Sequence, residues 1–295
     1  MSLKSVASSD FSGRRRQRLS GTPLQSELGA WVTLPDYRTR AACPIMLSMY
    51  RPAPALLPTA VLTVIKATPG WLVRLDAELM YLLATLQRGR ALSGGILEIG
   101  TYAGKSAIAL AAALGPDETL FLCDPYVDTA PTSDTACEGR ERLHPETPLA
   151  NLARVFPLLH VEFLHYPSSE LPSMGLSDAN LRVVHVDGSH SYEDCRSDIL
   201  WSRRHLDDSM GLLVVDDFRA AQTPGVAAAF WETYLAGYFQ DCILTEHKAY
   251  LLFGSGWSGW ISWLLPILRG RVGLQEERVG RRTLTRLWPL NQCSD

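Results

Sequence analysis

The chain has 295 residues, of which 46% are hydrophobic and 20% charged, and its formal net charge is −3. This is ordinary globular composition, enough for one large domain with an appendage. The charge gives no electrostatic case for binding nucleic acid. No run of about 18 apolar residues predicts a membrane span, and the N-terminus lacks the apolar core of a secretory signal.

Six scattered cysteines form no C-x-x-C pair. Three of them, Cys123, Cys195 and Cys242, fall inside predicted strands or a helix. This pattern predicts buried free thiols in a reducing compartment and argues against a zinc site or a disulfide framework. We therefore expect a cytoplasmic protein.

The first 90 residues divide into two parts. Residues 1–24 are rich in Ser and Arg and predict a disordered basic tail. Residues 25–90 predict an N-terminal cap with helices. Its first half, up to about Pro58, is rich in prolines and aromatics and is a candidate cover for the substrate. Apolar residues at helical spacing then predict an amphipathic helix over 71–88.

The stretch from Gly94 to Asp124 opens the main domain, which we place at 91–255. It reads as a buried strand over 96–99, a glycine turn, a helix over 105–114 and a second strand over 119–123. A parallel βαβ unit of this kind binds a ligand at the carboxyl ends of its strands. Glycines let the backbone approach that ligand closely, and Asp124 stands where a carboxylate can accept the hydroxyls of a ribose.

Three ligands compete for this unit. The turn lacks the middle glycine of a dinucleotide site, and a phosphate-binding P-loop would need a glycine at Ile99. The pattern E-x-G-x-x-x-G followed by an acid after the next strand is matched fully, by Glu98, Gly100, Gly104 and Asp124. It resembles motif I of the class I S-adenosylmethionine (SAM) methyltransferases. A nucleotide-dependent phosphotransferase with Lys105 and Ser106 on phosphate is the alternative.

Later elements complete a predicted sheet. Strands are expected over 161–164, 182–186 and 211–215, with helices over 147–156, 191–206 and 226–235. Two short strands, 242–245 and 250–253, predict an antiparallel hairpin. The expected fold is α/β and Rossmann-like, as in class I methyltransferases: a mostly parallel seven-stranded sheet with helices on both faces and a terminal antiparallel hairpin.

Acidic residues follow two of these strands. Asp187 ends one strand, and Asp216 and Asp217 end the next. Strand tips are neighbours in a parallel sheet, so these carboxylates should converge and repel unless a cation lies between them. Hard oxygen ligands suit Mg²⁺ or a similar divalent ion. His190, three residues after Asp187, is placed to take a proton from a substrate hydroxyl.

The segment from Val183 to Phe218 resembles a family of metal-dependent class I SAM methyltransferases, which includes macrolide-sugar O-methyltransferases and cephalosporin-hydroxylase-like proteins. Its pattern is D-G-x-H-x-Y, a helix, a strand, then an acidic pair and an aromatic. The resemblance, over residues 94–253, implies a Mg²⁺ ion on Asp187, Asp216 and Asp217, with His190 as general base and Asp187 beside it. It implies a SAM site formed by Glu98, Gly100, Thr101, Tyr102, Gly104, Ser106, Asp124, Tyr126, Ser168, Ser169 and Asp187.

The implied reaction is O-methyl transfer to a hydroxylated small molecule of sugar or natural-product type. A family member that uses the same fold without methylating is a further alternative. His185, inside its strand, faces opposite to Val184 and Val186, and we interpret it as structural.

The last segment, 256–295, is a Trp-rich and basic extension. Its apolar part, residues 257–268, is too short to span a bilayer. We expect it to pack on the core or on a partner subunit, with contact to a membrane surface as the weaker reading. A homo-oligomer is left open.

Overall fold

The computed structural model describes residues 56–126, 144, 146–174, 176 and 180–290. These residues belong to one compact unit that spans 52–295. The predicted basic tail, nearly all of the predicted proline-rich cap and most of the loop after Asp124 lie outside the described residues. The cysteines at 123, 195 and 242 are buried free thiols, as predicted.

The centre of the unit is a sheet of nine strands in the order β3-β2-β1-β4-β5-β7-β6-β9-β8. The first five strands of the chain run parallel, and β7 runs antiparallel between β5 and β6. This confirms the α/β, Rossmann-like fold with its antiparallel β6–β7 hairpin. The strands are β1 Gly95–Ile99, β2 Leu120–Cys123, β3 Val161–Leu164, β4 Leu181–Val186, β5 Gly211–Val215, β6 Asp241–Leu244, β7 Ala249–Phe253, β8 Val272–Val279 and β9 Arg282–Pro289.

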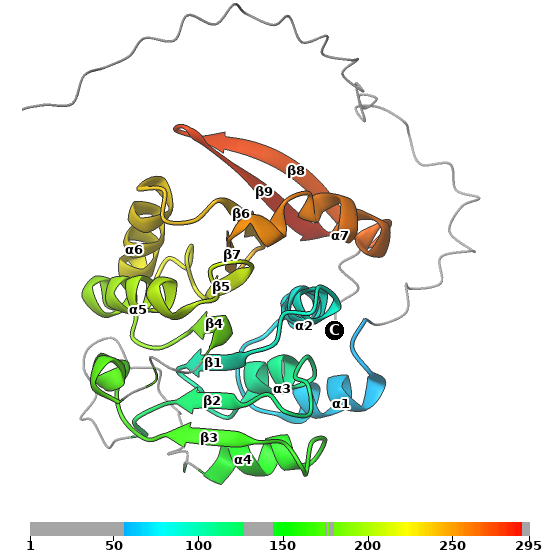
Figure 1. Ribbon diagram of the computed structural model, residues 1–295, viewed down its shortest axis with the longest axis vertical. Coiled ribbons are helices and arrows are strands. Elements are labelled where there is room, and N and C mark those ends of the chain that lie inside the picture. The colour runs from blue at the N-terminus through cyan, green and yellow to red at the C-terminus, as the bar shows by residue number, and fades with distance from the viewer. Residues whose placement is uncertain (1–55, 127–143, 145, 175, 177–179, 291–295) are drawn as a thin grey trace, which may run out of the picture. The chain divides into compact units, whose positions relative to one another are not determined.

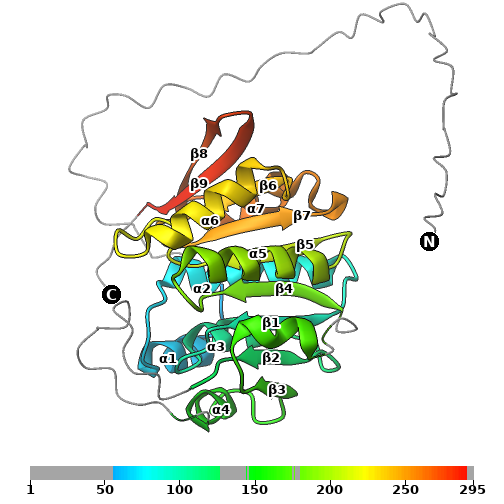
Figure 2. The same cartoon turned by 90° about the vertical axis from the view of Figure 1, so that its left-hand side faces the viewer.

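Helices cover both faces of the sheet, as Figures 1 and 2 show. On one face lie α1, α2, α3 and α7, and on the other lie α5 and α6. The α-helices are α1 Thr59–Ala67, α2 Arg74–Gly89, α3 Lys105–Ala111, α4 Glu146–Ala153, α5 Tyr192–His205, α6 Pro224–Leu235 and α7 Trp260–Leu268; the short 3-10 helices used below are η2 Ser168–Ser173 and η4 Ser255–Trp257.

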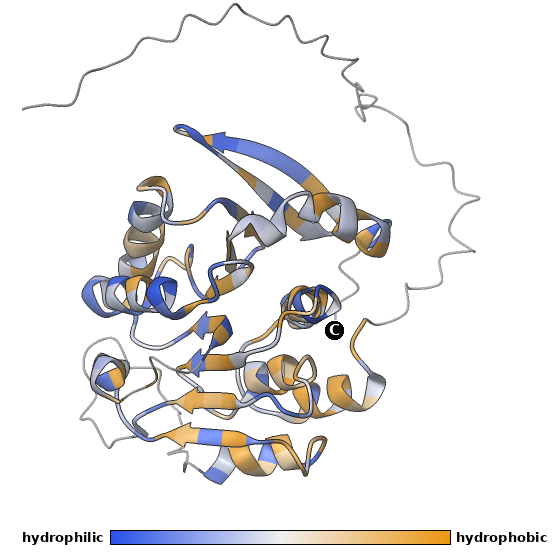
Figure 3. Cartoon of the chain, viewed as in Figure 1, coloured by the Kyte–Doolittle hydropathy of each residue, from blue (hydrophilic) through white to orange (hydrophobic). Residues whose placement is uncertain are grey.

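Side chains of the central strands alternate between two hydrophobic cores. In β1, Ile96 belongs to the core under α2 and α3, whereas Leu97 and Ile99 belong to the core under α5 and α6. In β4, Val184 and Val186 lie on the second side. Because side chains alternate along a strand, Glu98 and His185 face the first side, toward α2. The apolar colouring of the inner strands in Figure 3 follows this two-sided burial.

The predicted seven-stranded sheet is wrong in number, because β8 and β9 extend it. Residues 272–279 and 282–289 pair antiparallel over their whole length, joined by Gly280 and Arg281. Gly280 has φ +61°, which suits a two-residue hairpin turn. The many arginines here suggested only a basic segment. Arg278, Arg282 and Arg286 lie in these strands, and Figure 3 shows β8 as largely hydrophilic.

The Trp-rich part of the extension packs on the core, as expected. Trp257, Trp260 and Leu264 are buried in the same core as α2, and the indole N–H of Trp257 donates to the Gly211 carbonyl at 2.8 Å. Burial of aromatic side chains contributes strongly to stability. No described helix is long and apolar enough to cross a membrane.

A buried ion pair stabilises the edge of the sheet opposite the carboxyl ends of the strands. The Arg182 guanidinium donates to both oxygens of Glu118, at 3.0 and 2.9 Å, and is fully buried. Further donations to the carbonyls of Ala84 and Ala113 join β4 to the ends of α2 and α3.

Glu118→Ala is expected to lower the free energy of unfolding by about 3–5 kcal/mol, because it leaves a buried guanidinium without its counter-charge. Glu277→Ala is the matched control. It removes a pair with Arg286 whose side chains are 44% and 45% exposed, and such pairs contribute about 1 kcal/mol or less. Urea denaturation of both variants measures the difference, and equal small losses would contradict the buried pair's role.

Candidate active site

The candidate site lies where β1 and β4 meet, the point at which the strand order reverses. Ligands of open α/β sheets bind at the carboxyl ends of the strands beside such a point. The turn after β1 and the tip of β4 touch here. A Cβ added to Gly100 would lie 2.0 Å from the carbonyl oxygen of Asp187. The glycine turn and the first acidic tip therefore form one continuous surface.

The glycine turn has an unusual backbone. Gly100, Tyr102 and Gly104 have φ values of +84°, +49° and +81°. A Cβ on Gly104 would come within 2.9 Å of Pro148 in α4. Such left-handed backbone favours glycine, and for tyrosine it is a strained conformation of the kind that gathers at functional sites. The turn therefore fits the predicted cradle for a bound cofactor.

Asp124 at the tip of β2 braces this turn. Its Oδ2 accepts hydrogen bonds from the backbone amides of Thr101 and Tyr102, at 2.9 and 3.0 Å, and its Oδ1 accepts from the amide of Tyr126 at 3.0 Å. A carboxylate offers about four acceptor positions. Three are used within the protein, so Asp124 has room for about one further donor instead of the two ribose hydroxyls that the sequence suggested.

Aromatic side chains flank the braced turn. The Tyr126 hydroxyl donates to the Tyr102 carbonyl, and the Tyr126 ring lies 5.7 Å from the ring of Phe163. On the other side the ring of Trp71, 71% exposed, lies 5.9 Å from that of Tyr102. Flat apolar surfaces of this kind suit a planar ligand such as an adenine or an aromatic acceptor.

Lys105 does not point into the turn as a phosphate ligand would require. Its ammonium donates to the Gly70 carbonyl at 2.9 Å, and burial lowers its pKa. It ties the segment before α2 to the start of α3. This contact weakens the phosphotransferase alternative, which needs Lys105 on phosphate. Ser106 is buried in the first turn of α3.

The two serines predicted at the adenine differ in their surroundings. Ser169 is exposed, while Ser168 at the start of η2 is half-buried and acts to lower the pKa of Asp198 in α5. Asp198 is 4% exposed, and its Oδ2 has no hydrogen-bond partner among the described residues. Burial raises the pKa of Asp198 to about 7, with Asp194 adding to the rise.

The buried carboxyl of Asp198 should make the free energy of unfolding depend on pH. Because its folded pKa exceeds its unfolded value, its contribution is fully present below about pH 4 and is lost as pH rises through about 7. Asp198→Asn removes this loss. From pH 5 to about pH 7 we expect the free energy of unfolding of the variant to rise relative to wild type by about 2–3 kcal/mol, and the difference to stay level up to pH 8. Thermal unfolding at both pH values checks it, and a difference that does not change with pH would contradict it.

Beside the glycine turn lies a second set of side chains, Asp187, His190 and Asp217. Their ligand atoms all lie within 4.8 Å of one another, and the group is half-exposed. His190 Nε2 lies 3.4 Å from Asp217 Oδ2. We call this set the outer group. It joins the loop after β4 to the tip of β5.

The outer group is held in place by the start of α6. The buried Thr223 hydroxyl donates to the Asp217 carbonyl at 2.9 Å. A Cβ on Gly225 would lie 2.7 Å from the His190 carbonyl oxygen, so only glycine lets the helix pack this closely. Asp217 itself has φ +55°. Strained backbone that is fixed by its neighbours marks a functional position.

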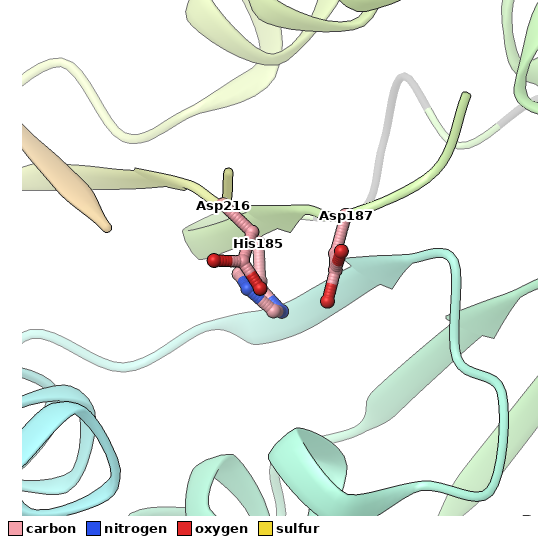
Figure 4. Close-up of side chains that lie close together, drawn as sticks. All are labelled: His185, Asp187 and Asp216. Atoms are coloured by element: carbon pink, nitrogen blue, oxygen red, sulfur yellow. The ribbon is translucent and has the colours of Figure 1, made fainter. Parts of the chain in front are cut away.

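The Asp216 side chain contacts residues that do not belong to the outer group. Its Oδ2 lies 2.5 Å from the ammonium of Lys248, which lies 3.1 Å from Nε2 of His185; His185 Nδ1 lies 2.9 Å from Glu98 Oε1. His185, Asp187 and Asp216 are drawn in Figure 4, and their ligand atoms also lie within 4.8 Å of one another. We call these three residues the inner group. His185 and Glu98 are fully buried.

The three acids differ in how far nearby positive charges offset the effect of burial on their pKa. Burial and then the Asp216 carboxylate raise the pKa of Asp187 well above its ordinary value. Burial would raise that of Asp216, but Lys248 and His185 bring its pKa below the ordinary value. Burial and Asp216 raise the pKa of Asp217, opposed by His190. Asp187 and Asp217 are therefore short of positive charge, whereas Asp216 is satisfied.

The three carboxylates of the predicted metal set have different neighbours. Among the described residues, Asp216 and Asp217 fall into different candidate groups that share only Asp187. The donor set of the outer group, two carboxylates and an imidazole with ligand atoms within 4.8 Å of one another, suits a divalent ion. The inner group does not fit, because Lys248 already supplies a cation to Asp216. No sequence motif marks Lys248 as a partner of these acids.

Glu98 fits a ligand that donates hydrogen bonds. Its Oε1 contacts His185, while its buried Oε2 has no partner among the described residues. A buried acceptor without a donor is costly, and Glu98 lies in β1 next to the glycine turn. The ammonium of an amino-acid moiety such as that of SAM is a donor of the right charge.

The sheet order places the candidate site at the carboxyl ends of β1 and β4. Residues 97–218 match the family described as "Methyltransferase domain". No curated protein matches the chain. The family match spans β1 through β5 and the loop of the outer group, which is the part that carries the candidate site.

Several solved structures are similar to this chain. TomG, an O-methyltransferase from Streptomyces achromogenes involved in tomaymycin synthesis and solved with SAM, is 22% identical, with 67% of this chain and 91% of that chain covered and a TM-score of 0.48. An O-methyltransferase from Bacillus cereus with SAH is 16% identical (65% and 87% covered, TM-score 0.44). CalS11, a TDP-rhamnose 3'-O-methyltransferase of calicheamicin biosynthesis, is 16% identical (68% and 82%, TM-score 0.44). The roles of residues here rest on their own geometry.

Proposed function

We propose that the protein transfers the methyl group of SAM to a hydroxyl of a small molecule. The observation that carries this proposal is the meeting of two half-sites at one sheet edge. The strained glycine turn braced by Asp124 adjoins the outer group of Asp187, His190 and Asp217, with Gly100 against the backbone of Asp187. Methyl transfer needs the cofactor and the proton acceptor side by side.

On the cofactor side, the turn after β1 takes the amino-acid part of SAM and the tip of β2 takes the ribose. Glu98 Oε2 accepts from the SAM ammonium, and Asp124 accepts one ribose hydroxyl with its remaining lone pair. Ser168, half-buried at the start of η2, is the candidate polar contact to the adenine. Tyr126 and Phe163 supply a flat wall for the ring.

On the acceptor side, His190 is the general base. With its Nε2–H donated to Asp217, the lone pair of Nδ1 accepts the proton of the acceptor hydroxyl. The oxygen then attacks the methyl carbon in line, the carbon–sulfur bond breaks, and S-adenosylhomocysteine leaves. Asp217 keeps the imidazole oriented and stabilises its protonated form, as the carboxylate does in other His–Asp pairs.

A divalent cation fits beside this base. Asp187 and Asp217 would hold it, in place of the predicted set with Asp216. Mg²⁺ prefers oxygen ligands and is often bound by one or two carboxylates together with substrate oxygens. When bound, it would neutralise these carboxylates and favour ionisation of an acceptor that carries two adjacent oxygens. Because Mg²⁺ prefers oxygen ligands, the imidazole of His190 would stay free to accept the proton.

Calorimetric titration with SAM, with ATP as the control ligand, tests the proposal. SAM binding without ATP binding is the expected result. Screening hydroxylated metabolites for S-adenosylhomocysteine release, with and without Mg²⁺ and with chelator, then identifies the acceptor class. ATP binding without SAM binding would overturn the proposal in favour of phosphoryl transfer. Equal turnover with Mg²⁺ and with chelator would remove the cation from it.

A further inference from the structure

We propose that Lys248 is the resident cation of the inner group, standing where a divalent ion would otherwise bind, and that removing its charge turns this group into a divalent-cation site. The inference concerns the protein's own charges, so it holds or fails without reference to methyl transfer. The protein thus contains two acidic groups that share Asp187, where the sequence suggests a single one.

The ammonium of Lys248 is fixed inside the protein. The residue is 1% exposed, and Nζ lies 2.5 Å from Asp216 Oδ2 and 3.1 Å from His185 Nε2. Hydrogen bonds also fix the backbone of Lys248. The amide of Lys248 donates to Thr245 Oγ1 at 3.0 Å, and its carbonyl accepts from the Thr245 amide at 2.9 Å. The tight turn between β6 and β7 therefore fixes the position from which the Lys248 side chain extends.

Carboxylates surround this ammonium from three elements. Asp216 follows β5, Asp187 follows β4 and Asp76 lies in α2, and all three act electrostatically on Lys248. Glu98 joins the set through His185. One oxygen each of Asp76 and Glu98 has no hydrogen-bond partner among the described residues. Carboxylates buried this closely repel one another unless a cation compensates them, and Lys248 is the ammonium that lies among them.

A metal ion and Lys248 exclude each other here. The ligand atoms of His185, Asp187 and Asp216 lie close enough to share one ion. Any such ion would bind the Asp216 carboxylate that Lys248 already contacts, and two positive charges a few ångströms apart in a buried place repel strongly. Figure 4 shows the carboxylates of Asp187 and Asp216 near the ring of His185, the space that both cations would use.

The internal cation also supports the outer group. Asp216 Oδ1 accepts the amide of Asp217 at 2.8 Å while Lys248 holds the other oxygen. Both oxygens of Asp216 are thus fixed beside the left-handed backbone of Asp217, whose carboxylate lies 3.4 Å from His190 Nε2. Lys248 therefore acts as a positioning residue for the outer group.

The test uses Mn²⁺ as the probe, because it accepts both oxygen and imidazole ligands. Asp217→Asn removes a carboxylate of the outer group and serves as the background. Calorimetry and electron paramagnetic resonance then compare this variant with Lys248→Met and Lys248→Arg in the same background. We expect Mn²⁺ to bind the Lys248→Met protein at least about tenfold more tightly than the other two.

Thermal unfolding gives a second readout. Lys248→Met should lower the melting temperature, and Mn²⁺ should restore it as a ligand that binds only the folded state. If Lys248→Met does not fold without metal, refolding in Mn²⁺ but not in buffer supports the same conclusion. Equal Mn²⁺ affinity of all three proteins would overturn the proposal. The proposal would also be overturned if the Asp217→Asn protein, with Lys248 intact, bound Mn²⁺ and lost that binding when Asp216→Asn was added. Mn²⁺ would then bind the inner group beside Lys248.

Discussion

His190→Ala is expected to lower kcat by about 10²–10⁴-fold while leaving the affinity for SAM within about twofold of wild type. His190 contacts Asp217 in the outer group and does not touch the glycine turn. The loss should depend on the acceptor. A phenolic hydroxyl, which ionises readily in water, needs a base less than an aliphatic alcohol does. Steady-state rates with both acceptor types measure this ratio.

His160→Ala is the matched control. That ring is exposed, at the opposite edge of the sheet, where it hydrogen-bonds Thr119. Its removal should leave kcat unchanged. If His190→Ala and His160→Ala turn over equally fast, His190 is not the base. If His190→Ala loses the same factor with both acceptor types, its role is orientation of the acceptor.

Gly100→Ala should weaken SAM binding by at least about a hundredfold, or about 3 kcal/mol, and destabilise the fold by about 2–5 kcal/mol. The new Cβ would lie 2.0 Å from the Asp187 carbonyl oxygen and 2.8 Å from the Gly188 Cα, at a φ of +84°. Backbone of β1 and β4 must move apart to admit it. Calorimetry with SAM and urea denaturation measure the two effects.

Gly89→Ala separates this collision from a general effect of replacing glycine. Gly89 ends α2, has no atom within 4 Å of an added Cβ and lacks the left-handed φ. Alanine there should leave SAM affinity unchanged and leave stability equal or slightly higher, since it restricts the unfolded chain. A Gly100→Ala protein that binds SAM as wild type does would show that the turn does not contact the cofactor.

The fold and one side of the site follow from local pattern. Short apolar runs that end in Asp124, Asp187 and Asp216 mark parallel strands and their tips, and each of these strands forms at the expected residues. The helix expected from residue 191 also forms, and the Ser191 side chain caps it by accepting the Asp194 amide. Strand tips converge for geometric reasons, so the sequence predicts which acids approach one another.

The partners of those acids depend on tertiary contacts that no spacing encodes. Lys248 reaches Asp216 only because β7 inserts antiparallel beside β5, which brings positions 216 and 248 together. Asp124 is occupied by turn amides because Tyr102 takes up a left-handed backbone. The β8–β9 hairpin escaped detection because its charged residues obscure the alternation that marks a strand.

The position of Lys248 along the chain has a consequence for synthesis. Asp76, Glu98, Asp187 and Asp216 all precede it, so a nascent chain presents these acids before their counter-charge has been made. Uncompensated carboxylates favour water over burial. The buried acids therefore obtain their counter-charge only once β7, which follows Lys248, pairs with β5 in the sheet.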